Sequence, residues 1–117
     1  MEITQKEFMV KTGLNVGVVS SVFSFLEHQG VAKIVGMKRS ASGKGKPTKI
    51  YEIPETVEFT LSAGEYTTGQ LAEKLGIAYN TVSNTVHYLL SMGLINICGG
   101  LGKAKLYKFP AKVSVTF

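Results

Sequence analysis

The stretch "TTGQLAEKLGIAYNTVSNTVHYLLSMGLINI", residues 67–97, decides the fold. Thr67 with Gln70 three residues later is the capping-box pattern that begins a helix, and Gly76 suits the left-handed position that ends one. Apolar side chains then recur at helical spacing: Val82, Val86 and Leu89. The stretch therefore predicts a short helix, a tight turn, a second helix over about 79–92, and the start of a strand.

A fainter copy of this pattern occurs earlier in the chain. Residues 1–35 align with 64–98 at a shift of 63 without a gap, and nine of the 35 positions are identical. The alignment resumes at a shift of 56, with "KIYEIPETVEFTL" (49–61) over "KLYKFPAKVSVTF" (105–117). The second copy has thus lost seven residues (63 − 56), all between residues 34 and 49 of the first. Loops tolerate such length changes, so this segment is predicted to be a surface loop.

We therefore divide the chain into repeat 1 at 1–61 and repeat 2 at 64–117, joined by a linker at 62–63. In repeat 1 a second helix is predicted at about 16–29. Its start and end signals match those of repeat 2, and its apolar positions again have helical spacing: Thr4, Glu7 and Gly13, then Val19, Val22, Phe23 and Leu26. Each repeat ends in an alternating strand, "TVEFTL" or "KVSVTF", whose period of two implies one buried face.

Composition restricts the class of protein. With 44% hydrophobic and 18% charged residues, the chain is typical of a soluble globular protein rather than a disordered one. No apolar run reaches the ~18–20 residues that span a bilayer, and "MEITQKEF" lacks the features of a secretory signal. We therefore expect a cytoplasmic protein without a membrane partner. The net charge of +5 favours an anionic partner.

The single cysteine, Cys98, cannot form an internal disulfide. It lies within the apolar strand pattern that follows the second helix of repeat 2. We expect it to be buried there as a small hydrophobic side chain.

Helix, turn, helix and a two-stranded hairpin with a Gly-rich tip resemble the winged helix-turn-helix family. "TTGQLAEKLGI" is similar to the positioning helix and turn of that family, and "NTVSNTVHYLLSMGLI" to its recognition helix and exit into the wing. The general likeness is to transcriptional regulators of bacteria, archaea and their viruses. The resemblance implies an α+β fold of two tandem winged helix-turn-helix repeats, each with two main helices and a β-hairpin wing. It also implies binding to double-stranded DNA in transcription regulation.

One feature departs from the family pattern. Winged helices usually begin with an additional helix that closes the core, and neither repeat has room for it. Units of about 55 residues are marginal at burying their own core, so we expect the repeats to pack on each other, or on a second chain as a homodimer. The extra strands at 56–61 and 112–117 are suited to that contact. Phe25 and Tyr88 hold equivalent positions, and we expect both to pack between the repeats.

In helix-turn-helix proteins the second helix enters the major groove with its N-terminal residues toward the base edges. In repeat 2 the outward positions of that helix are predicted to be Tyr79, Asn80, Thr81, Ser83, Asn84 and His87. Asn pairs with adenine, Ser and Thr hydroxyls bond bases or phosphates, and His87 is placed to reach a phosphate. An ordinary solvated helix face is the alternative. The corresponding positions of repeat 1 are small or apolar: Val16, Gly17, Val18, Ser20, Ser21 and Ser24. The three serines remain candidates for DNA contact.

The predicted wing of repeat 1, residues 36–50, holds five cations and no acidic residue: Lys38, Arg39, Lys44, Lys46 and Lys49. Such a loop suits phosphates or a narrow minor groove, and "GKGKP" resembles the Arg-Gly-Arg-Pro element of minor-groove hooks. A solvated loop whose charge only aids solubility is the alternative. The shorter wing of repeat 2 keeps Lys103 and Lys105.

These patterns suggest that the repeats divide the work of binding. The helix at 79–92 would supply base contacts, and the loop at 38–49 would supply most of the electrostatic affinity. A chain with two like units can also span two half-sites about one helical turn apart, either alone or as a dimer.

Catalysis is not expected. His28 and His87 lie in different repeats, so with one thiol no metal-ligand spacing exists. The chain has no aspartate, which removes the commonest orienting residue of a triad. The glycines at 43–45 and 99–102 lack Walker spacing. We expect no cofactor and no small-molecule substrate, and we interpret His28 as a surface residue favoured by the helix dipole.

Two other classes of function remain open. One is a protein-interaction module that uses an apolar helix face of Val16, Val18 and Phe25. The other is a structural or assembly protein in which "KVSVTF" offers a strand edge for pairing.

Overall fold

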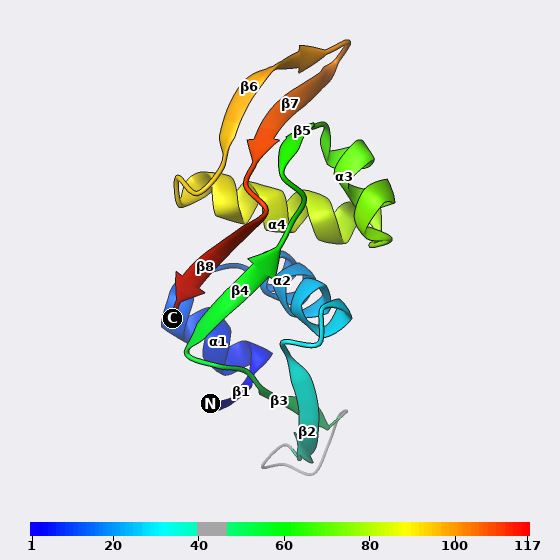
Figure 1. Ribbon diagram of the computed structural model, residues 1–117. Coiled ribbons are helices and arrows are strands. Elements are labelled where there is room, and N and C mark those ends of the chain that lie inside the picture. Colours follow the sequence, from blue (N-terminus) through cyan, green and yellow to red (C-terminus); the bar gives the residue numbers. More distant parts are fainter. Residues whose placement is uncertain (40–46) are drawn as a thin grey trace.

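The computed structural model of the protein describes residues 1–39 and 47–117 and has an α+β fold, as predicted. The order of elements runs twice through the same series (Figure 1). Repeat 1 contains β1 (Glu2–Thr4), α1 (Gln5–Thr12), α2 (Val16–His28), β2 (Lys33–Lys38), β3 (Thr48–Glu52) and β4 (Thr56–Thr60). Repeat 2 contains β5 (Gly64–Tyr66), α3 (Thr68–Leu75), α4 (Tyr79–Ser91), β6 (Asn96–Leu101), β7 (Ala104–Phe109) and β8 (Lys112–Thr116).

Each repeat begins with the helix start that its sequence predicts. The Thr4 hydroxyl accepts a hydrogen bond from the Glu7 amide while the Glu7 carboxylate accepts one from the Thr4 amide, and Thr67 and Gln70 do the same. The Thr4 bonds lower the pKa of the Glu7 carboxyl. Gly13 ends α1 with φ 74° and its counterpart in α3 has φ 69°, a left-handed conformation that suits glycine.

The second helices, α2 and α4, are each 13 residues long. Their bounds agree with the predicted ranges to within one residue, and glycines with positive φ follow both of them. No single helix among the described residues is long and apolar enough to cross a membrane. Only the pair α1 and α2, which bends by 116°, reaches that length and composition when its two members are counted together.

Three small antiparallel sheets follow from this order. Each repeat has a three-stranded sheet, β1-β3-β2 or β5-β7-β6, and the last strands of the two repeats form the ribbon β4-β8. The hairpins β2–β3 and β6–β7 carry a register shift at equivalent places, between Ile34 and Gly36 and between Ile97 and Gly99. This shared irregularity shows that the two hairpins have the same local construction.

The ribbon β4-β8 joins the repeats symmetrically, as the need for a shared core predicts. Glu58 lies opposite Ser114, its own equivalent at the shift of 56. Thr56 pairs with Thr116, and Thr60 pairs with Lys112. At the shift of 56, Thr56 corresponds to Lys112 and Thr60 to Thr116, so the second pair repeats the first with the two strands exchanged. A contact in which each partner uses the same patch is isologous. A pseudo-twofold axis therefore passes through the centre of the ribbon.

The helices α2 and α4 pack against each other on the same axis. Asn84 Nδ2 donates a hydrogen bond of 2.9 Å to Ser21 Oγ, and these two residues are equivalents at the shift of 63. A second equivalent pair, Val22 and Thr85, is fully buried. Both the ribbon and the helix contact thus obey one symmetry.

The two repeats share a single hydrophobic core. The ring of Phe8 in α1 packs edge-on against Phe117 at the far end of the chain, with centroids 4.6 Å apart. Phe25 is fully buried against Phe59 of its own repeat, whereas Tyr88 lines a groove together with Thr12 and other residues of repeat 1. The interior therefore depends on both repeats together.

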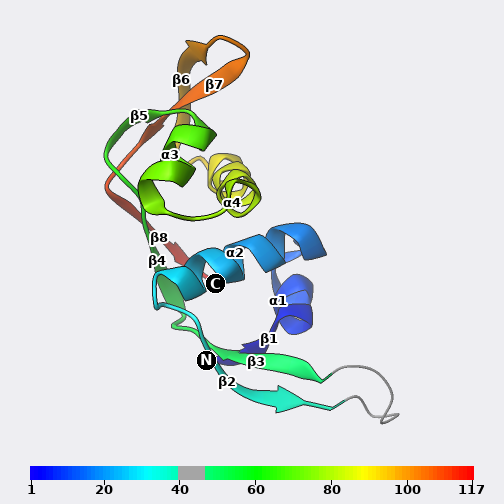
Figure 2. The same ribbon diagram turned by 90° about the vertical axis from the view of Figure 1, so that its right-hand side faces the viewer.

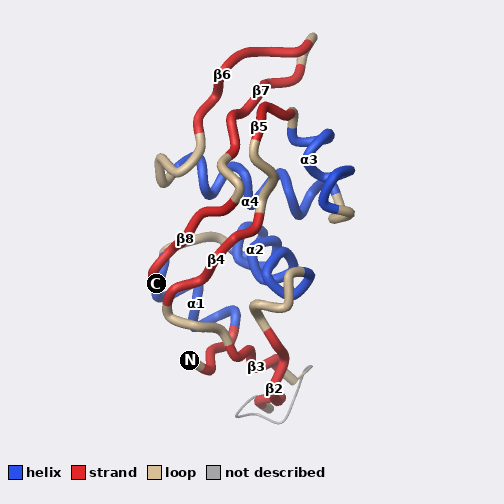
Figure 3. The backbone as a smooth tube through the Cα atoms, in the orientation of Figure 1, coloured by secondary structure: helices blue, strands red, loops and turns tan. Residues whose placement is uncertain are grey.

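The molecule is elongated, with extents of 50 × 26 × 25 Å. The hairpins β2–β3 and β6–β7 lie at opposite ends of the long axis (Figures 1 and 3). The turned view places the β4-β8 ribbon along one side of the stacked helices α2 and α4 (Figure 2). This arrangement exposes both hairpins and leaves the helix pair at the centre.

We predict that Phe59→Ala destabilises both repeats at once. Phe59 is fully buried, so its truncation is expected to lower the free energy of unfolding by about 3–5 kcal/mol. Urea unfolding followed by circular dichroism is expected to show one cooperative transition shifted to lower urea. Val10→Ala, at a position 82% exposed, should change stability by about 0.5 kcal/mol or less. Two separate transitions in the Phe59 variant would contradict a shared core.

Candidate nucleic-acid interface

A groove of about 370 Å³ lies between α4 and the β6–β7 hairpin, and we call it the repeat 2 groove. Tyr79, Ser83 and His87 form one wall because they are four residues apart along α4 and so share a face. The other wall comes from the hairpin: Lys103, Ala104, Lys105 and Tyr107. The groove thus combines side chains from two of the segments that the sequence singled out, the second helix and the wing of repeat 2.

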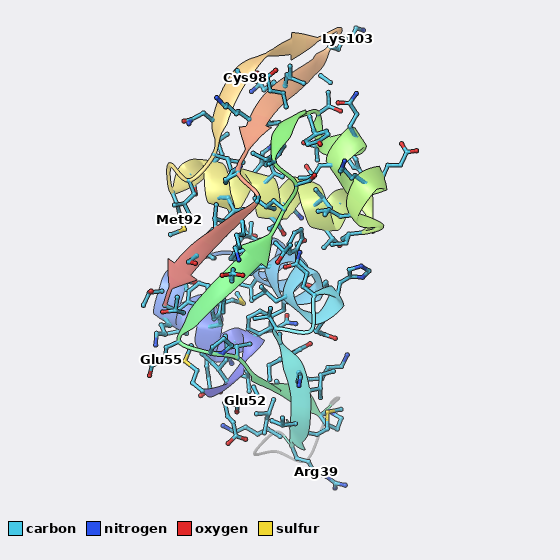
Figure 4. All side chains as sticks on the ribbon, viewed as in Figure 1. Arg39, Glu52, Glu55, Met92, Cys98 and Lys103 are labelled. Carbon is cyan, nitrogen blue, oxygen red and sulfur yellow. The ribbon has the colours of Figure 1, made fainter. Side chains whose placement is uncertain are left out.

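Strand geometry explains which lysines reach this groove. Successive side chains of a strand point to opposite faces, so Lys105 shares a face with Tyr107 while Lys108 lies on the other. Lys103 sits in the turn of the hairpin, after Gly102 with φ 63°, and Figure 4 shows it at the tip. The hairpin therefore presents Lys103 and Lys105 to the groove, and Lys108 lies on its other face.

The N-terminus of α3 also borders the groove, through Thr67, Thr68 and Gly69. The capping box satisfies the amide of Gln70, but it leaves the amides of Thr68 and Gly69 without an acceptor inside the helix. Such amides and the helix dipole favour an anion. None of the described residues that line the groove is acidic. The groove therefore presents positive charge and backbone donors, which suit an anion.

Acidic side chains of β5 and α3 lie away from the groove. Glu65 and Glu73 border a separate depression together with Gln70 and Lys74. Lys74 Nζ lies 5.4 Å from the centre of the Tyr66 ring there. The acidic side chains of this depression are thus kept out of the repeat 2 groove, whereas the cations of repeat 2 lie on both sides.

Repeat 1 has an equivalent groove of about 270 Å³, lined by Gln5, Thr48, Lys49 and Tyr51. These residues are the equivalents of Thr68, Ala104, Lys105 and Tyr107 at the two shifts. Gln5 donates a 3.3 Å hydrogen bond to the Tyr51 hydroxyl, and burial raises the pKa of Tyr51. On α2, Val16 and Ser24 stand where α4 has Tyr79 and His87. Repeat 1 keeps the lysine and the tyrosine but offers fewer polar groups.

The structure brings together part of the predicted recognition face of α4. Tyr79, Asn80 and His87 are exposed, and Thr81 and Ser83 are half-buried. On α2, Ser20 and Ser24 are exposed as predicted. The apolar helix face proposed for a protein partner is incomplete, because Phe25 is fully buried.

Two predicted outward positions are wrong. Ser21 and Asn84 bond each other across the contact between α2 and α4, and Ser21 is buried. Their polar side chains face a second helix instead of solvent. The spacing of residues within one helix does not indicate that α2 and α4 pack together. Ser21 and Asn84 were therefore predicted to lie on solvent-exposed faces.

Within one chain, the packing of α2 on α4 argues against two half-sites one helical turn apart that are read by these two helices. Helices in contact have axes about 8–10 Å apart, whereas successive major grooves on one side of a duplex are about 34 Å apart. Because α2 and α4 pack together, they cannot enter two such grooves at once.

The cations of the repeat 1 hairpin lie far from those of repeat 2. Lys38 and Arg39 are exposed at the end of β2, where Figure 4 shows Arg39, and Lys49 lines the repeat 1 groove. Lys44 and Lys46 fall outside the described residues. Two cationic surfaces therefore occupy opposite ends of the molecule.

The predicted burial of Cys98 is wrong. Cys98 is exposed because it is the extra residue at the register shift in β6, on a hairpin that projects from the body (Figure 4). Its thiol donates a weak 3.5 Å hydrogen bond to the Leu106 carbonyl. Local desolvation and the nearby Glu65 carboxylate raise the pKa of the thiol.

The sequence did not single out the residues at the start of α3, or Tyr107, as part of a site. The capping box at Thr67 was interpreted only as a helix start. Two features of the sequence could have indicated this groove. They are the helix start at Thr67 and the polar residues Tyr79, Ser83 and His87, which are spaced four apart on the next helix.

No protein-family model matches the chain, and no curated protein or solved structure matches it significantly. The interpretation of the grooves therefore depends on their own geometry and residue chemistry.

We predict that Cys98 reacts with iodoacetamide in the native protein, because it is exposed. The reaction needs the thiolate, so the raised pKa of Cys98 shifts the midpoint of the rate–pH profile above that of a cysteine in a short unstructured peptide. Glu65→Gln is expected to lower that midpoint, since it removes a neighbouring negative charge. The measurement is mass spectrometry of alkylation against pH; an inert thiol would contradict the exposed position.

Proposed function

We propose that the protein binds double-stranded DNA through the repeat 2 groove, as a transcriptional regulator built from two winged helix-turn-helix units. One observation carries the proposal: a polar face of α4 and two lysines of the adjacent hairpin line the same groove. A recognition helix beside a cationic hairpin is the arrangement expected for base contacts next to phosphate contacts.

The groove offers different chemistry to the two parts of a duplex. Ser83 lines the groove, and Asn80 and Thr81 lie outside it near the start of α4. Their amide and hydroxyl groups suit base edges in the major groove. Lys103 and Lys105 supply charge for the phosphates beside it. The amides of Thr68 and Gly69 add donors that suit a phosphate oxygen.

Repeat 1 adds a second cationic surface. Lys38, Arg39 and Lys49 lie on the β2–β3 hairpin, and the equivalent helix α2 presents the small side chains Ser20 and Ser24. We therefore assign phosphate contacts to repeat 1, and base contacts to α4. In this arrangement only one second helix reads bases, which agrees with the packing of α2 on α4.

Protein binding is the second candidate, and one observation favours it. The strand β2 lies at the edge of its sheet and exposes the large apolar side chains Ile34, Val35 and Met37. An apolar edge strand is suited to pairing with another chain. This surface shares no residue with the repeat 2 groove.

We predict salt-dependent binding to a labelled random-sequence duplex, measured by fluorescence anisotropy at several salt concentrations. Lys105→Ala is expected to weaken binding at every salt concentration. It should also reduce the slope of log affinity against log salt by about 0.9 if one phosphate contact is lost. Asn80→Ala is expected to weaken binding to a selected sequence, without a comparable change in slope, because an amide that contacts a base edge carries no charge.

The matched control is Lys108→Ala, which removes the same charge from the other face of β7. This variant is expected to keep most of the affinity and the original slope. Equal losses in the two lysine variants would show that only net charge matters. No retention on duplex at low salt would refute DNA binding and favour a protein partner.

A further inference from the structure

A third groove, of about 430 Å³, lies where the repeats meet. Leu14 follows α1 of repeat 1, Tyr88 and Met92 belong to α4 or its end, and Phe117 ends the described chain after β8. Its volume is in the range of small-ligand pockets, about 300–1,000 Å³. Its walls are mainly apolar, and they come from both repeats.

The pseudo-twofold symmetry is broken at this groove. At the equivalent place in the other half, the Gln29 side chain donates to the Thr60 carbonyl and accepts from the Thr60 amide. At the shifts of 63 and 56, Gln29 corresponds to Met92, and Thr60 to Thr116. A methionine cannot form the amide bridge, and Met92 is 46% exposed beside the groove. Figure 4 shows Met92 at the end of α4.

Tyr88 adds a polar group to this groove. The side chain is only 8% exposed, and its hydroxyl makes no hydrogen bond to the described part of the chain, although its oxygen is not sealed from solvent. Burial raises the pKa of Tyr88, so the hydroxyl remains a donor at neutral pH. The equivalent residue, Phe25, has no such group. Tyr88 is therefore a mostly buried residue of the groove wall whose hydroxyl can donate to an acceptor that a ligand brings.

Lys11 provides a charge at the same groove. Its equivalent, Lys74, lies over the Tyr66 ring instead. Lys11 is exposed and has only a weak contact of 4.0 Å with the Met1 sulfur. The ammonium group is therefore available for an anion that enters the groove.

We propose that this groove is a binding site for a small aromatic carboxylate. The ring packs on Leu14, Met92 and Phe117, while the carboxylate accepts a hydrogen bond from Tyr88 and pairs with Lys11. This site is separate from the repeat 2 groove, so the proposal holds whether or not the protein binds DNA. Because the ligand contacts both repeats, its binding stabilises the joined arrangement by mass action.

The probe is 2-naphthoate, titrated into the full chain by isothermal calorimetry and by protein-observed NMR. We expect saturable 1:1 binding, with shifts in the signals of α1, the end of α4 and β8. The neutral analogue 2-naphthalenemethanol is expected to bind about tenfold more weakly, because it lacks the charge. Tyr88→Phe is expected to weaken naphthoate binding by about tenfold, as for the loss of a hydrogen bond to a charged group.

Two variants at exposed positions keep the test valid if Tyr88→Phe perturbs folding. Lys11→Ala is expected to weaken naphthoate binding about tenfold, and Lys74→Ala, its pseudo-twofold equivalent, is expected to leave it unchanged. Met92→Gln restores the residue of repeat 1 and is expected to reduce binding by bridging to Thr116. Absence of saturable binding, or equal affinities for Lys11→Ala and Lys74→Ala, would overturn the proposal.

Discussion

The contact between the two repeats on the pseudo-twofold axis is the constraint on which the rest of the structure depends. Within the described residues each repeat has only two helices, and a unit of about 55 residues is marginal at burying its own core. The ribbon β4-β8 and the helix pair α2–α4 supply the missing cover from the other repeat. The same contact determines which helix faces are free, and it places the two hairpins at opposite ends. Any function of this protein must be compatible with second helices that stay together.

The elements with local signals could be predicted from the sequence. The capping boxes at Thr4 and Thr67, the left-handed glycines, and the apolar spacing of α4 depend on residues within one turn or one helix. Comparison of the repeats also predicted the extra strands and their use in joining the copies. The errors concern contacts between distant segments. Ser21 and Asn84 are polar, yet they meet at a helix contact, and the register shift that exposes Cys98 leaves no mark in an apolar strand pattern.

The candidate sites arise from differences between the repeats. The fold places a groove beside the hairpin of each repeat, but His87 and Tyr79 make the repeat 2 groove more polar than that of repeat 1, where Ser24 and Val16 stand. In the groove where the repeats meet, Met92 stands where repeat 1 has Gln29, so the side-chain bridge to the last strand is missing on that side. Tyr88 stands where repeat 1 has Phe25, and it adds a hydroxyl group to the groove. A duplicated chain can vary each half separately, which a dimer of identical subunits cannot do. The core positions Val19, Val82, Leu26 and Leu89 remain apolar in both copies, because the shared interior must be kept.

The central claim is that the two repeats form one cooperative structure through the axis contact. Native-state hydrogen exchange under mild denaturant tests it most directly, by resolving the opening free energies of amides in β4, β8, α2 and α4. The account predicts that the slowest amides of all four elements open with a common free energy, equal to that of global unfolding. Opening of β4 and β8 at a much lower free energy, while each helix kept its own protection, would contradict the claim.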